Sequence, residues 1–152
     1  MLFVWIALVT RYYFDAAINV YYIAMSVVGW IKWVPDKDSG AITVEKISSD
    51  RLVTWLLISG AVCIGLAYVV DRISNPSLVY LDSFTTVFAM LATWMLVKKI
   101  KENWLIWIAV DLVAAGMYFH KELYFIGVLF LIYTAFAVFG YIQWSRMLTQ
   151  QT

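Results

Sequence analysis

The stretch "LYFIGVLFLIYTAFAVFGYIQW" spans residues 123–144, and "YYFDAAINVYYIAMSVVGWIKW" spans residues 12–33. Each is an apolar run close to the length that a helix needs to cross a bilayer. The shared Tyr, Gly and Trp are spaced by seven and then four residues, which places them on one face of each helix. The chain is therefore predicted to contain a repeated helical unit. At an offset of 111 residues, eight of 22 positions are identical: Tyr13 with Tyr124, Phe14 with Phe125, Tyr22 with Tyr133, Ala24 with Ala135, Val27 with Val138, Gly29 with Gly140, Ile31 with Ile142 and Trp33 with Trp144.

The composition assigns the chain to a membrane. Hydrophobic residues make up 64% of it and charged residues only 14%, and bilayer-length apolar runs recur. The net charge of +1 gives no reason to expect a nucleic-acid partner, and the single Cys63 offers neither a disulfide framework nor a pair of metal ligands. We expect no cofactor. The prediction is an all-α polytopic membrane protein with spans at Tyr12–Trp33, Leu52–Val70, Tyr80–Val97, Asn103–Phe119 and Leu123–Trp144.

Basic residues predict the orientation of these spans. If each span crosses once, the positive-inside rule puts the loop 34–51 and the C-terminus in the cytoplasm. Spans 12–33 and 123–144 then both run inward, so the repeat is a parallel one. The loop is expected to be only a connection. One side receives Lys32, Lys37, Lys46, Arg51, Lys98, Lys99, Lys101 and Arg146, and the other receives Arg11, Arg72 and Lys121. Aromatic anchors at the membrane interface are expected at Trp5, Trp33, Trp55 and Trp144.

The first unit of the repeat is predicted to be incomplete. Met1–Val9 reaches only about 14 Å as a helix, too short to cross about 30 Å of hydrocarbon, and is expected to be the tail of a separate helix. At the offset of 111 residues, the positions of the first copy that would correspond to Trp104 and Trp107 fall before Met1. A truncated fragment, a misplaced start and a natural short protein all stay open. The predicted divisions are a partial first bundle 1–33, a loop 34–51, a linking helix 52–70, a complete second bundle 80–144 and a tail 145–152.

A carboxylate within an apolar span marks the candidate site. Asp111 lies in "ENWLIWIAVD", and an ionisable group at that depth is costly unless it is used or paired. Trp104, Trp107, Asp111 and Tyr118 advance by three, four and seven residues, so they share one helix face. Such a face suits a flat aromatic or cationic vitamin. Two alternatives stay open: Trp104 as an interfacial anchor, and Asp111 as a partner of Ser or Thr on a neighbouring helix. Weaker candidates are Asn19, Tyr22, Asp82 and Tyr133.

The stretch "LDSFTTVFAMLATWMLVKKIKENWLIWIAVD" (residues 81–111), followed by residues 123–144, resembles the PnuC family of vitamin transporters, whose best-known members take up nicotinamide riboside. The resemblance implies two three-helix bundles joined by a linking helix, as in the SWEET sugar transporters, with substrate held between them. Within the resemblance, Asn103, Trp104 and Trp107 match the family's "NWxxW" motif. Asp82 and Ser83 match its aspartate and serine, Asn19 falls where relatives often have glutamine, and Asp111 lies where some carry asparagine.

The resemblance further implies facilitated uptake across a bacterial inner membrane, with cytoplasmic phosphorylation trapping the vitamin for NAD biosynthesis. Thiamine and riboflavin are alternative substrates. An intramembrane enzyme is not expected, because no nucleophile lies beside a base and no metal-ligand spacing is present. The rival hypothesis is a partner subunit that does not itself transport. The expected partners are a small-molecule vitamin and the lipid bilayer, and a homo-oligomer is compatible with an incomplete first bundle.

Overall fold

The computed structural model describes the backbone of residues 2–33, 43–74 and 78–151, and the side chains of residues 17–33, 43–72 and 78–150. Within these ranges the chain forms five α-helices and no β-strand, as the all-α prediction requires. The predicted loop falls partly outside the described residues, which omit 34–42. The helices are α1 (Leu2–Trp33), α2 (Ser49–Ser74), α3 (Val79–Val97), α4 (Asn103–His120) and α5 (Tyr124–Gln151).

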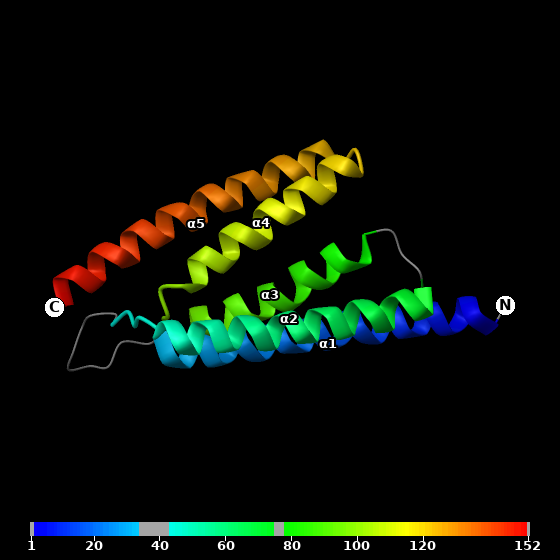
Figure 1. Cartoon of the computed structure of the whole chain (residues 1–152), viewed down its shortest axis with the longest axis horizontal. Helices are drawn as coiled ribbons and strands as arrows, with labels where there is room; N and C mark the ends of the chain where they lie inside the picture. The colour runs from blue at the N-terminus through cyan, green and yellow to red at the C-terminus, as the bar shows by residue number, and fades with distance from the viewer. Residues whose placement is uncertain (1, 34–42, 75–77, 152) are drawn as a thin grey trace.

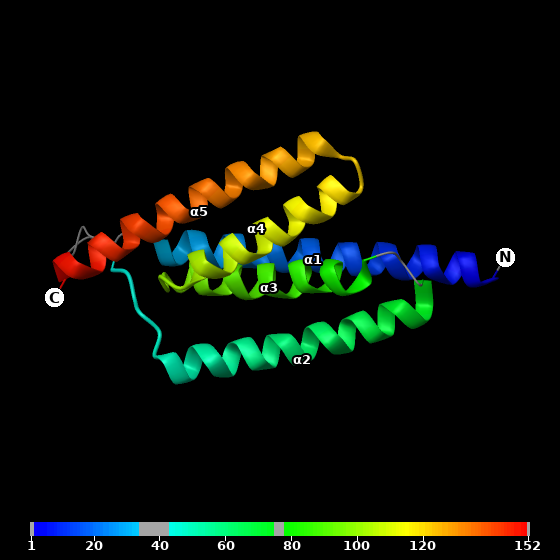
Figure 2. The same cartoon turned by 45° about the horizontal axis from the view of Figure 1, so that its top comes forward.

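Successive helices run in opposite directions. Figure 1 shows α1, α3 and α5 running one way and α2 and α4 the other, and the turned view in Figure 2 agrees. This alternation is what a chain that crosses a bilayer repeatedly would show. The two helices that carry the predicted repeat, α1 and α5, are therefore parallel. The described basic residues that follow α3 and precede α2 and α4 lie at one end of the molecule.

The centre of the molecule is formed by α3 and α4. α4 packs on both α3 and α5, while α3 also packs on α1 and α2. Figure 2 shows α2 lying to one side of the other helices. The two central helices and the turn between them supply the core, because their apolar residues face neighbouring helices on several sides. The buried core residues are Ala89, Leu91, Ala92, Met95, Ile100, Ile106 and Val110.

The outer surface is strongly apolar. Phe125 of α5 is 93% exposed and Trp30 of α1 is 78% exposed. Burial of a large apolar side chain stabilises a protein in water by about 1.5–3 kcal/mol, so these residues indicate a lipid environment. Among the described residues, three helical segments are long and apolar enough to cross a membrane: Ser49–Arg72, Val79–Val97 and Tyr124–Gln150. The predicted spans in α1 and α4 are not among the three. In α4, Asn103 and Asp111 reduce the hydropathy, and both are buried within the protein.

Two helix boundaries differ from the prediction. The sequence predicts a separate helix ending at Val9, whereas α1 is continuous from Leu2 to Trp33. Thr10 and Arg11 interrupt the apolar pattern, but neither residue breaks a helix as Gly or Pro does. The 32 residues of α1 extend about 48 Å. Likewise, α5 continues to Gln151, so most of the predicted tail is helical.

A short segment before α2, residues 43–48, is attached to the α3–α4 turn, and we call it the strap. Glu45 forms a parallel β-bridge with Ile100, in which two backbone hydrogen bonds of 2.9 Å join Glu45 to the residues on either side of Ile100. The Ile47 N–H also donates to the buried Glu102 carboxylate at 3.2 Å. The last residues of the predicted loop are therefore fixed to the turn, a contact that the sequence did not predict.

Candidate substrate site

One face of α4 lines a cavity of about 310 Å³. Trp107, Asp111 and Tyr118 all lie on this wall, as do Val110 and Ala114 between them. Their spacing keeps them on one helix face. Asp111 lies eight residues after the first residue of α4 and nine before the last, so the wall is centred near the middle of the helix. The periodicity of the sequence thus identified a face that the fold turns inward.

Three other helices complete the cavity. α1 contributes a tyrosine, α3 a carboxylate and two threonines, and α5 a phenylalanine. The lining residues from these helices are Ile18 and Tyr22 of α1, Asp82, Thr85, Thr86 and Ala89 of α3, and Phe130 of α5.

Aromatic contacts fix two of the walls. Tyr118 and Phe130 stack with ring centroids 5.3 Å apart and an interplanar angle of 11°, which joins α4 to α5. On the opposite side, the Tyr21 hydroxyl donates to the Met90 carbonyl at 2.7 Å and ties α1 to α3. The Tyr22 ring meets the Tyr21 ring edge-on at 5.5 Å. A flat ligand inside the cavity would therefore meet aromatic rings held in place by their neighbours.

The polar groups of the cavity are mainly acceptors. Asp111 is only 4% exposed. None of the described residues donates a hydrogen bond to its carboxylate, and none forms an ion pair with it. The hydroxyls of Thr85 and Thr86 donate to the backbone carbonyl of Asp82, at 3.0 and 2.8 Å, so their oxygens keep only acceptor capacity. The alternative in which Asp111 merely binds a Ser or Thr hydroxyl thus has no such bond among the described residues. A ligand with donors or a positive charge would complement this cavity.

A salt bridge lies near the rim of the cavity. The Lys121 ammonium is 3.9 Å from the Asp82 carboxylate, and both side chains are substantially exposed. Lys121 also lies over the Tyr118 ring, 6.0 Å from its centroid. An exposed pair at this distance contributes about 0–1 kcal/mol, so Asp82 remains available to a ligand as well as to Lys121.

Comparison with known proteins assigns the chain to a family. The family model described as nicotinamide mononucleotide transporter matches residues 1–146. The chain belongs to this family. The predicted family is therefore confirmed, and its description is that of a transporter rather than an enzyme.

Individual relatives of the family are distant in sequence. The nicotinamide riboside transporter PnuC of Neisseria mucosa is 21% identical over 163 residues, covering 99% of this chain and 62% of the relative. PnuC of Escherichia coli is 19% identical, covering 87% of this chain and 66% of the relative. PnuC of Haemophilus influenzae is 20% identical, covering 83% of this chain and 56% of the relative. The chain thus spans less than two thirds of the length of these relatives. No solved structure is a significant match.

Of the nine residues predicted to bind substrate, five line the cavity and four do not. The lining includes Tyr22, Asp82, Trp107, Asp111 and Tyr118. Outside it are Asn19, next to the lining residue Ile18 on α1, and Asn103, Trp104 and Tyr133. As part of a substrate site, each of the nine remains a prediction.

Asn103 and Tyr133 make contacts that hold neighbouring elements in place. Asn103 is 0% exposed, and its side-chain amide donates to the Ile100 carbonyl at 2.6 Å, which stabilises the α3–α4 turn. Tyr133 meets Phe130 edge-on at 5.9 Å, so it supports a lining ring from behind. Phe130, Thr85 and Thr86 were missed by sequence reasoning. The "TT" pair three residues after Asp82 was the available signal, whereas nothing along α5 distinguished Phe130 from other phenylalanines.

Trp104 is part of a tryptophan cluster at the basic end of the molecule. Its ring meets Trp144 edge-on at 5.5 Å, and Trp144 in turn lies 6.1 Å from Trp33. Trp144 is only 6% exposed, so its prediction as an interfacial anchor is wrong: it packs inside the protein. Trp33 and Trp144 are equivalent positions of the predicted repeat, and their contact brings α1 and α5 together at this end. The Trp5 side chain lies outside the described side chains.

Proposed function

We propose that the chain is, or forms part of, a membrane transporter for the facilitated uptake of nicotinamide riboside or a closely related vitamin. The observation that carries the proposal is a cavity in which aromatic rings meet, near the middle of α4, a carboxylate that has no partner among the described side chains. Its volume of about 310 Å³ lies at the small end of the range of ligand pockets, about 300–1,000 Å³. Membership of the family and the names of its relatives support the same ligand class.

The cavity complements each part of such a ligand. Nicotinamide riboside combines a flat pyridinium cation with an amide and ribose hydroxyls. The cation gains about 0.5–2 kcal/mol over the face of Trp107 or Tyr118. The Asp111 carboxylate balances its charge in a site of low dielectric constant, where a buried charge needs a partner. The ribose hydroxyls and the amide then donate to Asp82 and to the threonine oxygens.

Transport in this proposal uses the repeated arrangement of helices. Two parallel bundles that rock about a central site give each side of the membrane access in turn. The cavity takes lining residues from both α1 and α5, the helices of the predicted repeat. Uptake would be downhill, with the C-terminus in the cytoplasm of a bacterial cell. Cytoplasmic phosphorylation of the vitamin would then trap it inside.

One observation favours a second candidate, a partner subunit that does not transport by itself. Within the described residues, α1 packs chiefly on α3. This leaves part of the α1 surface open to a second copy or another chain. This candidate predicts a folded protein that binds no vitamin in isolation.

Binding of a charged and a neutral form of one ligand tests the proposal. Nicotinamide riboside is a cation, whereas its reduced dihydropyridine form is neutral and nearly identical in shape. Titration calorimetry on the purified chain should show tighter binding of the cation, and Asp111→Asn should weaken that binding at least tenfold, since removing one member of a buried charge pair costs about 2–5 kcal/mol. The neutral form should be much less affected.

The matched control is Asp71→Asn, on α2 outside the cavity, which should change neither affinity. An equal loss for both ligands in Asp111→Asn would leave Asp111 as a structural residue. Failure of the folded chain to bind either ligand, thiamine or riboflavin would contradict the transporter proposal and favour the partner subunit.

A further inference from the structure

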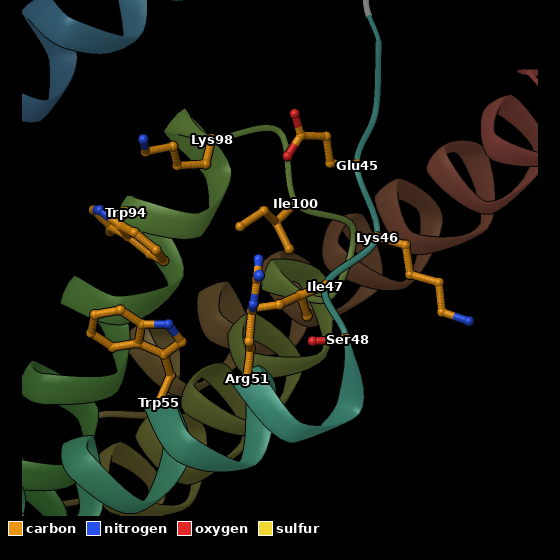
Figure 3. A pocket seen from close by; sticks show the side chains of 9 residues that line it. All are labelled: Glu45, Lys46, Ile47, Ser48, Arg51, Trp55, Trp94, Lys98 and Ile100. Atoms are coloured by element: carbon orange, nitrogen blue, oxygen red, sulfur yellow. The ribbon is translucent and has the colours of Figure 1, made fainter.

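A second and larger cavity, of about 500 Å³, lies where α2 begins and α3 ends. Its walls come from the strap, the first turns of α2, the end of α3 and the α3–α4 turn (Figure 3). It shares no residue with the cavity described above. The lining residues are Glu45, Lys46, Ile47, Ser48, Arg51, Trp55, Trp94, Lys98 and Ile100.

The charge of this cavity is positive. Three cationic side chains line it, Lys46, Arg51 and Lys98, against one carboxylate, Glu45. Within the described part of the chain, Arg51 has no carboxylate within 4.0 Å. Figure 3 shows the Arg51 side chain reaching into the middle of the cavity toward Ile100, whereas Lys46 extends away from it. A planar guanidinium with several free donors is suited to binding a phosphate by two parallel hydrogen bonds.

One side of the cavity is aromatic. Trp55 of α2 and Trp94 of α3 lie with ring centroids 5.0 Å apart at an interplanar angle of 42°. The Lys98 ammonium is 6.0 Å from the Trp94 ring centroid. Trp55 is therefore more than the predicted anchor, because it packs on another ring and lines a cavity. An amphipathic ligand with an anionic head and an apolar portion would contact both the cations and these rings.

The wall formed by the strap is held in place. Its two backbone hydrogen bonds to the α3–α4 turn and its bond from Ile47 to Glu102 fix the segment that carries Glu45, Lys46 and Ser48. Because these bonds use backbone groups of the strap, they do not occupy the side chains of Glu45, Lys46 and Ser48. The Ser48 hydroxyl adds a neutral donor beside Arg51.

We propose that this cavity binds a phosphate ester, with Arg51 as the main phosphate ligand, Lys98 adding positive charge at the edge, and the Trp55–Trp94 pair against the apolar part. Two sources carry this chemistry: the headgroup of an anionic phospholipid, and a soluble phosphorylated metabolite. Basic pockets between transmembrane helices bind anionic lipid headgroups on the cytoplasmic side. This site is independent of the proposed transport function.

Two binding measurements distinguish the sources. In the lipid arm, native mass spectrometry of the detergent-purified chain compares phosphatidylglycerol with phosphatidylcholine of the same acyl chains. In the soluble arm, calorimetry with glycerol 3-phosphate is performed on the chain in phosphatidylcholine nanodiscs. Preferential binding of phosphatidylglycerol identifies a lipid site, and saturable binding of glycerol 3-phosphate identifies a metabolite site.

Three variants test the residues. Arg51→Gln should weaken binding about fivefold or more, the factor that corresponds to about 1 kcal/mol for one basic residue near the membrane surface. Arg146→Gln, at the same end of the molecule but outside the cavity, should have no effect. Glu45→Gln should strengthen binding, because it removes the opposing charge while its backbone bridge to Ile100 remains; misfolding could not produce such a gain.

The proposal is overturned if neither phosphate compound binds. It is also overturned if Arg51→Gln binds as tightly as the natural chain, as the control Arg146→Gln should. Loss of binding in both arginine variants would also overturn it, since it would show a diffuse effect of positive charge. Far-ultraviolet circular dichroism confirms that each variant is folded.

Discussion

Replacement of Gly140 by alanine tests the packing of α4 on α5. A Cβ at this position would lie 2.6, 2.7 and 2.8 Å from three ring carbons of Trp104, well inside the ordinary contact distance of 3.4 Å. The ring would have to move by most of an ångström, but Trp144 meets it edge-on and Trp33 lies behind Trp144. Overpacking of this kind costs about 1–3 kcal/mol. We expect Gly140→Ala to lower the free energy of unfolding by that amount.

The assay is chemical unfolding of the purified chain in detergent micelles, followed by circular dichroism. Gly116→Ala, on α4, is the matched control, because its added Cβ would meet no described atom within 4 Å beyond its chain neighbours and its own helix backbone; it should be neutral or stabilising. Trp104→Phe should lower stability less in the Gly140→Ala background than in the natural chain, since the smaller ring relieves the clash. Equal stability of the Gly140 and Gly116 variants would refute the close α4–α5 contact.

The remaining predictions concern the site and the strap. Trp107→Ala should weaken nicotinamide riboside binding at least fivefold in calorimetry, because it removes a ring that lines the cavity, whereas Trp30→Ala, 78% exposed on α1, should not; equal effects would contradict the site. Glu102→Gln should destabilise the strap by about 1 kcal/mol, since a charge-assisted bond to the Ile47 N–H becomes a neutral one. Faster amide hydrogen exchange at Ile47 would show this, and unchanged exchange would refute it.

Much of the helical fold was predictable from hydrophobicity alone. Apolar runs between charged segments located α2 to α4 and the start of α5 within a few residues, because each bilayer-length run must satisfy its backbone hydrogen bonds as a helix. The failure at Val9 has a physical cause. The polar pair Thr10 and Arg11 contains no Gly or Pro and does not end a helix. The drop in hydropathy at this pair therefore predicted a helix end that does not exist, and α1 continues through it.

The candidate site was predictable along one helix but not across helices. Helical spacing placed Trp107, Asp111 and Tyr118 on a shared face, and the fold turns that face into the cavity. The same spacing included Trp104, which the fold instead packs against Gly140, because periodicity defines a face but not the neighbour at each depth. Phe130 enters the lining only through the packing of α5 on α4, which no local pattern encodes.

The strap and its cavity were not predictable from the sequence. The bridge from Glu45 to Ile100 joins residues 55 positions apart, and only the tertiary arrangement brings them together. A polar loop read in isolation gives no sign of such a contact. The two tryptophans of the second cavity likewise come from different helices.

Ligand protection of a single cysteine tests most directly whether the cavity of about 310 Å³ is the substrate site. Cys63 is the only cysteine of the chain, so Cys63→Ser provides a background in which Thr86→Cys places one thiol in that cavity and Ser48→Cys one in the other. Nicotinamide riboside should slow the reaction of a methanethiosulfonate reagent with the thiol at position 86 and leave the thiol at position 48 unaffected. An unchanged rate at position 86 in the presence of saturating ligand would contradict the account.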